Sequence, residues 1–191
     1  MKNIITFLIV AISFQFAHAQ EFIATNKYTV ANRIDTKQEA YASVGFDIVA
    51  TEDPSLKIAS LNILDLDFFE DVTISLLKDP NLDNINEIIK VDINYSTCCN
   101  LAETHYFMVT YSNQSISLPA VENIYCENTE SEIQYIFPVQ ALGKEAIILK
   151  TEVSFTETHT MKGLKILQRF AWNDNDFNHN ESIAYTGIDN N

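Results

Sequence analysis

The chain has 191 residues, of which 47% are hydrophobic and 20% are charged, and its formal net charge is -14. This composition is typical of a globular protein and excludes a disordered chain, which would contain fewer aliphatic and aromatic residues. The acidic excess disfavours nucleic acids and anionic membrane surfaces as partners, because both repel a negative protein surface. Cations, basic peptides and neutral sugars remain compatible with this charge.

A secretory signal peptide is predicted at residues 1–19. Lys2 gives it a positive start, residues 4–16 are mostly apolar, and residues 17–19 (Ala-His-Ala) supply a cleavage site of small residues. The apolar run is too short for a membrane span, no later segment is apolar enough for one, and no cysteine lies at the cleavage site to carry a lipid anchor. We therefore expect a bacterial protein exported to the periplasm or outside the cell, with residues 20–191 forming one β-rich domain.

Alternation of apolar and polar residues predicts β-strands along most of the remaining chain. The segments with this pattern are 44–50, 58–63, 72–76, 89–97, 105–111, 115–118, 133–137, 147–156 and 164–172. Turn-forming residues separate them, and the long amphipathic helices that parallel strands require are missing from the sequence. The predicted fold class is all-β, an antiparallel β-sandwich of the jelly-roll or immunoglobulin-like type.

One short helix is predicted near residues 80–88. Asp79 could be its N-cap, Pro80 suits the first helical position, and apolar residues follow at helical spacing. The same segment begins like a calcium-binding loop, but Asn84 and Lys90 stand where such a loop needs glycine and glutamate. Residues 21–39 fit an edge strand, a short helix or a linker.

Three cysteines remain after the signal peptide, at positions 98, 99 and 126. In an oxidising compartment we expect one structural disulfide to Cys126, and either Cys98 or Cys99 could be its partner. Cys99 falls on the apolar side if the register of the preceding strand continues, so Cys99 and Cys126 are the candidate pair. The chain-entropy model gives such a disulfide a stabilisation of about 3.5 kcal/mol.

The alternative use of these cysteines is a metal site. Cys98, Cys99 and Cys126 could bind zinc or copper together with His105, since thiolates and imidazoles are the ligands these metals favour. Two adjacent cysteines do not match the regular two-pair spacing of zinc sites. His105 also fits a packed or surface position in a strand.

A candidate ligand site lies at the end of the last predicted strand. Trp172 could stack on a sugar beside the hydrogen-bonding side chains of Asn173, Asp174 and Asp176, and the two carboxylates could alternatively bind calcium. The position of Trp172 on the same strand face as Phe170 favours the core instead. The alternative for the Asn/Asp segment is a polar surface loop.

The chain contains none of the common catalytic motifs: no phosphate-binding glycine loop, Gly-x-Ser-x-Gly, His-Glu-x-x-His or dinucleotide fingerprint. This absence disfavours an enzyme, and no cofactor is expected. We interpret the chain as a non-catalytic binding or interaction module for a glycan or another protein. The alternatives are a small metal-binding protein and an inhibitor or assembly factor for a basic partner.

Overall fold

A computed structural model describes residues 20–38, 41–63, 67–126, 131–156, 158, 160–173 and 176–180, with backbone only for 32–38, 41–44, 173 and 176–180. The described residues form β-strands and connecting segments, and they include no helix. All strand pairs are antiparallel. The predicted all-β fold with antiparallel sandwich packing is therefore confirmed.

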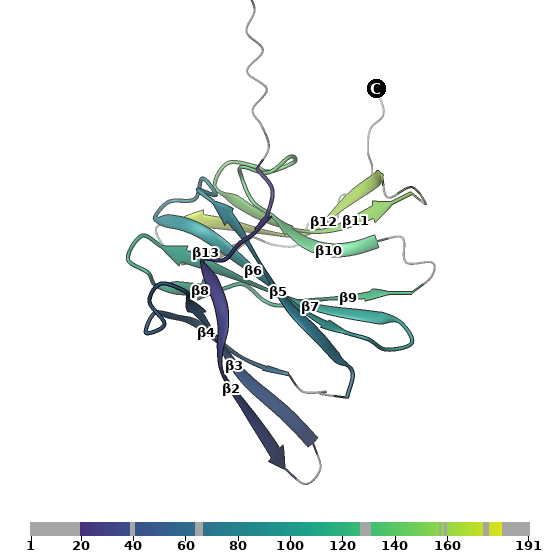
Figure 1. The fold of residues 1–191 in the computed structure, drawn as a ribbon. Helices are drawn as coiled ribbons and strands as arrows, with labels where there is room; N and C mark the ends of the chain where they lie inside the picture. Colours follow the sequence, from purple (N-terminus) through teal and green to yellow (C-terminus); the bar gives the residue numbers. More distant parts are fainter. Residues whose placement is uncertain are drawn as a thin grey trace, which may run out of the picture.

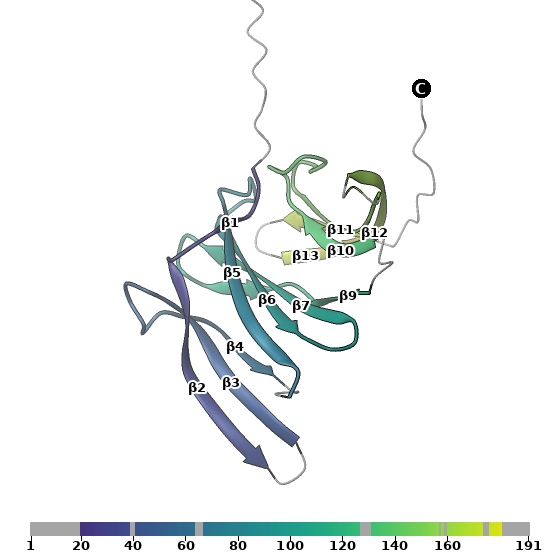
Figure 2. The same cartoon turned by 45° about the vertical axis from the view of Figure 1, so that its right-hand side comes forward.

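The strands form three sheets that lie in three layers (Figures 1 and 2). The central sheet contains β1 (Ile23–Ala24), β5 (Phe69–Lys78), β6 (Ile85–Tyr95), β7 (Asn100–Thr110), β8 (Ser115–Ser117) and β9 (Val121–Tyr125). The second sheet contains β2 (Tyr28–Gln38), β3 (Tyr41–Ala50) and β4 (Lys57–Ile63). The third contains β10 (Ser131–Ile136), β11 (Ile147–Phe155), β12 (Met161–Asn173) and β13 (Asp176–Asn180). Most strands that are neighbours in a sheet are also consecutive in the sequence, which is a meander arrangement. Jelly rolls and immunoglobulin-like sandwiches instead use Greek-key connections.

The central sheet is covered on both faces, which explains the strongly apolar sequence of its middle strands. Ile89, Val91 and Ile93 of β6 pack in a cluster with residues of the β2–β4 sheet. Ile88 of β6 packs in a second cluster with residues of the β10–β13 sheet. Successive side chains of a strand point to opposite faces, so adjacent isoleucines serve different clusters. Two sandwiches therefore share one sheet.

The predicted short helix near residues 80–88 is wrong. Asp79, Asn81 and Asn84 have φ angles of 43°, 57° and 61°, which lie outside the right-handed helical region. Asparagine and aspartate tolerate this left-handed conformation better than other non-glycine residues, so the segment forms a tight connection between β5 and β6. Residues from Ile85 onward pair with β7 instead.

A buried ionic contact joins the central sheet to the β2–β4 sheet. Glu87 is 3% exposed, and its carboxylate accepts hydrogen bonds from the Lys27 ammonium at 2.6 and 2.8 Å and from the Tyr28 hydroxyl. Burial, reinforced by the neighbouring Glu87, raises the pKa of Tyr28 and keeps its hydroxyl protonated as a donor. The buried carboxylate is therefore fully compensated.

We expect Glu87→Ala to lower the free energy of unfolding by about 2–3 kcal/mol, because the buried Tyr28 hydroxyl would lose its acceptor. Lys27 is half exposed and its ammonium would return to water. Urea unfolding followed by circular dichroism measures the change. Glu70→Ala is the matched control, because Glu70 is exposed on β5 and its removal is expected to cost less than about 0.5 kcal/mol. Equal stabilities of the two variants would contradict this role of Glu87.

Polar contacts also hold the β10–β13 sheet to the central sheet. The Asn123 side-chain amide donates to the Ile133 backbone carbonyl at 2.9 Å, and the Ile133 backbone amide donates to the side-chain Oδ1 of Asn123 at 2.6 Å. The Tyr135 hydroxyl donates to the Pro119 carbonyl at 3.0 Å. These bonds satisfy polar groups at the edge of the second apolar cluster, so the two sheets have one defined arrangement.

Candidate functional site

The connection between β5 and β6 presents several polar side chains at one end of the molecule. Asp79, Asn81, Asp83 and Asn84 are all exposed. Leu82, between them, is 5% exposed and belongs to the second apolar cluster. The buried leucine anchors the connection, and the alternating polar residues are left at the surface.

Hydrogen bonds fix the backbone of this connection. The Asp79 amide donates to the Asn86 carbonyl at 3.0 Å, and the Ile85 amide donates to the Leu82 carbonyl at 3.1 Å. The indole nitrogen of Trp172 donates to the Asp83 carbonyl at 2.7 Å. Contacts from both sheets thus hold the polar side chains on a fixed backbone, which reduces the conformational entropy that a ligand would have to remove.

Tyr111 lies beside this connection, directly after β7. Its side chain is 65% exposed, the largest exposed fraction among the large hydrophobic residues described. Its amide donates to the Asn84 carbonyl at 3.3 Å, which ties the β7–β8 turn to the β5–β6 connection. The turn is closed by the Thr110 amide, which donates to the Gln114 carbonyl at 2.9 Å. These backbone hydrogen bonds therefore fix Tyr111 at a position where its aromatic side chain is exposed to solvent.

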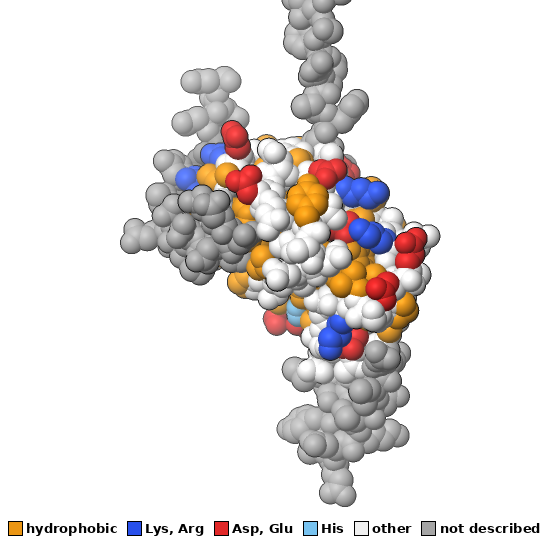
Figure 3. All heavy atoms as spheres, turned by 90° about the vertical axis from the view of Figure 1, so that its left-hand side faces the viewer, with side chains coloured by type: hydrophobic (Ala, Val, Ile, Leu, Met, Phe, Trp, Pro, Cys, Tyr) orange, Lys and Arg blue, Asp and Glu red, His pale blue; other side chains and the backbone are white. Residues whose placement is uncertain are grey.

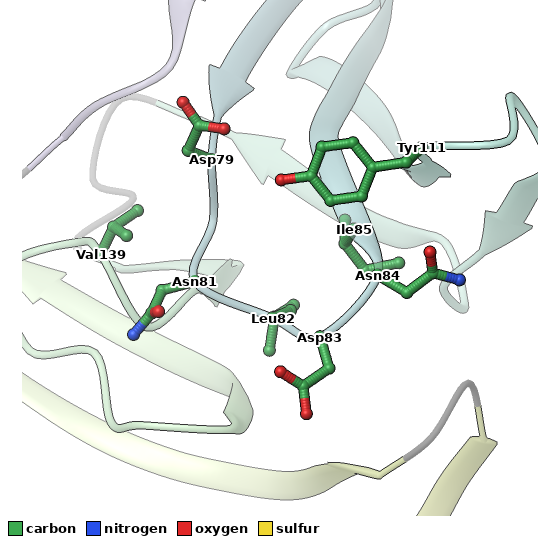
Figure 4. A pocket seen from close by; sticks show the side chains of 8 residues that line it. All are labelled: Asp79, Asn81, Leu82, Asp83, Asn84, Ile85, Tyr111 and Val139. Atoms are coloured by element: carbon green, nitrogen blue, oxygen red, sulfur yellow. The ribbon is translucent and has the colours of Figure 1, made fainter.

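The β5–β6 connection and Tyr111 line an open pocket of about 520 Å³. It is lined by Asp79, Asn81, Leu82, Asp83, Asn84, Ile85, Tyr111 and Val139. Figure 4 shows the hydroxyl end of Tyr111 pointing toward Asp79, and the Asp83 carboxylate near the opposite end of the loop. A pocket of this size accommodates a small-molecule ligand.

Val139 reaches the pocket from the connection between β10 and β11. Gly143 allows this connection to fold back on itself, because a Cβ at that position would lie 2.2 Å from the Phe137 carbonyl oxygen. The Gly143 amide donates to the Gln140 carbonyl at 2.9 Å, and the Gln140 amide donates to the Phe137 carbonyl at 3.0 Å. The pocket is thus formed at the junction of two sheets.

The surface shown in Figure 3 is mixed in character. Acidic and basic side chains are interspersed with small groups of hydrophobic side chains on this face.

Trp172 lies in the core, as its position on the same strand face as Phe170 favoured. Its ring is therefore not exposed for stacking on a sugar. Its side chain is 4% exposed and packs in the second apolar cluster. Asn173 and Asp176 pair at the ends of β12 and β13, although their side chains lie outside the described part of the structure. Asp174 and the calcium site suggested there also lie outside the described residues.

The disulfide between Cys99 and Cys126 is confirmed, with a Cα–Cα distance of 4.6 Å. The strand register does not extend to Cys99, however, because β6 ends at Tyr95 and both adjacent cysteines lie in the β6–β7 connection. Cys98 is exposed and has a free thiol. The predicted register fails here because the chain leaves the sheet before the cysteines.

The structure does not assemble the Cys/His metal cluster. The disulfide occupies the sulfur atoms of Cys99 and Cys126. His105 Nε2 lies 2.9 Å from a Glu103 carboxylate oxygen, and its ring stacks on Phe107 with a centroid distance of 6.3 Å. Among the residues described, no group of three or more histidine, cysteine or acidic side chains is placed to hold a metal ion.

Tyr111 and Val139 are pocket residues that the sequence interpretation did not select. A local signal exists for Tyr111, because Tyr106 and Tyr111 are in opposite phase in the predicted strand 105–111, and the structure buries Tyr106 and exposes Tyr111. Val139 carried no such signal, because its position depends on the docking of the β10–β13 sheet. The sequence pattern does single out the carboxylate and amide side chains from Asp79 to Asp83, but it indicates only an incomplete calcium-binding loop there.

In the part of the chain that the structure covers, no helix is long and apolar enough to cross a membrane. The sequence matches no known family model, and no curated protein or solved structure matches it.

Proposed function

We propose that this protein is an exported, non-catalytic glycan-binding module and that its ligand occupies the pocket beside Tyr111. The main supporting observation is the exposed tyrosine ring beside the carboxylates and amides of the β5–β6 connection. An aromatic ring provides an apolar surface for the C–H groups of a sugar. Carboxylate and amide groups can hydrogen-bond to hydroxyl groups at its edge.

The rigidity of the loop also favours recognition of a small ligand. Backbone hydrogen bonds to the Asn86 and Leu82 carbonyls, and the bond that the Trp172 indole donates to the Asp83 carbonyl, hold the polar groups in place without a ligand. The predicted signal peptide and the disulfide support export, because disulfides persist in oxidising compartments. A metal-binding role is less well supported, since two of the thiolates it requires are joined to each other.

Binding without catalysis is favoured by the surroundings of the two acidic side chains in the pocket. Asp79 and Asp83 are both exposed. The general acid of a glycosidase is commonly placed where an apolar environment favours its protonated form. A pair of exposed carboxylates is better suited to accept hydrogen bonds from sugar hydroxyl groups.

We expect Tyr111→Ala to weaken oligosaccharide binding at least about tenfold, which corresponds to about 1.4 kcal/mol. The signal-cleaved protein is titrated calorimetrically with cellotetraose, mannotetraose, xylotetraose, chitotetraose and the glucosamine tetramer. Tyr125→Ala is the matched control, because Tyr125 is also exposed but lies on β9, away from the pocket lining. Melting temperatures of both variants are measured to confirm that the fold is retained.

Wild-type affinity in Tyr111→Ala would contradict the proposed site. Failure of all five oligosaccharides to bind at millimolar concentration would contradict the glycan assignment. Mass spectrometry of the recovered oligosaccharide provides the test of catalysis, since a non-catalytic module leaves its length unchanged.

A further inference from the structure

We infer that the pocket selects glycans that carry free amino groups, an inference that rests on the proposed glycan-binding function. Among the described residues of its lining, the acidic side chains are Asp79 and Asp83, and the other polar groups are two amides and the Tyr111 hydroxyl. Among the residues that the structure describes, the lining contains no lysine, arginine or histidine. The charge of the pocket therefore favours a cationic ligand over a neutral one and a neutral ligand over an anionic one.

The two carboxylates are available for ligand contacts. Within the described part of the chain, neither Asp79 nor Asp83 forms an ion pair or a side-chain hydrogen bond. Both side chains are exposed, so they do not have to lose an existing partner when an ammonium group approaches. Lys78 precedes Asp79 in the sequence but is not part of the pocket lining.

The placement of the carboxylates suits a ligand with more than one amino group. Figure 4 shows Asp79 on the side of the Tyr111 hydroxyl, whereas the carboxylate of Asp83 lies farther along the connection and points away from Tyr111. A sugar stacked on Tyr111 would extend along the same connection. An oligomer of amino sugars could therefore place ammonium groups near both carboxylates, while a uronic acid oligomer would place negative charges beside them.

Oligosaccharides that share one ring skeleton provide the direct comparison. Each probe is added to the signal-cleaved protein at about pH 6, where most of the amino groups of glucosamine are protonated. The probes are the β-1,4-linked glucosamine tetramer, its N-acetylated form chitotetraose, the neutral cellotetraose and a galacturonate tetramer. We expect affinity to decrease from the amine-bearing to the neutral oligomers, with the weakest binding for the galacturonate tetramer.

The variant Asp79→Asn/Asp83→Asn tests the assignment to these carboxylates, because it preserves side-chain size and removes both charges. Each exposed ion pair is expected to contribute about two- to fivefold, so the double variant should bind the glucosamine tetramer about 4- to 25-fold more weakly. Its affinity for cellotetraose should change by less than about threefold, since an amide still accepts hydrogen bonds.

The control variant Glu70→Gln/Glu122→Gln removes the same net charge from exposed positions on β5 and β9. It should bind every probe within about twofold of wild type, because screening reduces the effect of exposed charges beyond a Debye length. An equal loss of glucosamine-tetramer affinity in this control would contradict a local role for Asp79 and Asp83. Tetralysine is added as a separate ligand.

The outcomes separate this inference from the proposed function. If the glucosamine tetramer and chitotetraose bind equally well at the Tyr111 site, selection for amines is wrong while glycan binding stands. If no oligosaccharide binds, both proposals fail. If tetralysine binds as tightly as the glucosamine tetramer, the pocket recognises positive charge without recognising sugar, and the inference is also wrong.

Discussion

Trp172→Ala is expected to lower the free energy of unfolding by about 3–5 kcal/mol, because it removes a large buried aromatic side chain. Trp172 is 4% exposed and packs between the central sheet and the β10–β13 sheet. Its indole also donates the hydrogen bond to the Asp83 carbonyl at 2.7 Å. The melting temperature should fall by about 10 °C for a chain of this size, as measured by calorimetry.

Trp172→Phe separates the packing contribution from the hydrogen bond. Phenylalanine retains much of the aromatic volume but cannot donate to Asp83, so we expect a smaller loss of about 1–2 kcal/mol. A melting temperature of Trp172→Ala within about 2 °C of wild type would show that Trp172 is not an essential part of the core. That result would restore the surface platform as an interpretation.

Removal of the disulfide is the second large effect. Cys99→Ala/Cys126→Ala is expected to lower the free energy of unfolding by about 3.5 kcal/mol, because the cysteines are separated by 27 residues and their cross-link restricts the unfolded chain. The bond also connects the β6–β7 turn to the residue after β9. Urea unfolding of the oxidised wild type and the variant under non-reducing conditions measures this difference.

Cys98→Ser is the matched control for the disulfide. Cys98 lies next to Cys99 but is exposed and has a free thiol, so its replacement should change stability by less than about 0.5 kcal/mol. Thiol counting of the wild type under denaturing conditions should give one free thiol. A large loss in Cys98→Ser, with little loss in the double variant, would indicate that Cys98 supplies the structural bond.

The alternating pattern was sufficient to predict most of the long strands, because one face of each strand packs against an apolar cluster. It was less informative in β6, where Ile88 and Ile89 are both fully buried and face different clusters. Consecutive apolar residues occur in β6 because the central sheet is covered on both faces, so side chains on either face are buried. The third layer depends on contacts between distant segments, so local periodicity could not predict it.

The β5–β6 connection illustrates a different limit of local sequence patterns. Leu82 and Ile85 have helical spacing, but both are buried by tertiary packing rather than by the face of a helix. The left-handed backbone conformations of Asp79, Asn81 and Asn84 are incompatible with a right-handed α-helix in this segment. The pocket further requires Tyr111 and Val139 from other connections, and the indole of Trp172, which is 89 residues away from Asp83, helps to fix the loop.

The central claim is that a glycan binds beside Tyr111, and amide chemical-shift mapping tests it most directly. The ¹⁵N-labelled, signal-cleaved protein is titrated with the tightest-binding oligosaccharide of the calorimetric panel. We expect saturable shifts centred on the amides of residues 79 and 81–85 and of Tyr111, with small changes on the β2–β4 sheet. Saturable shifts centred on β9 or β13, with the amides of the β5–β6 connection unmoved, would contradict the assignment of the site.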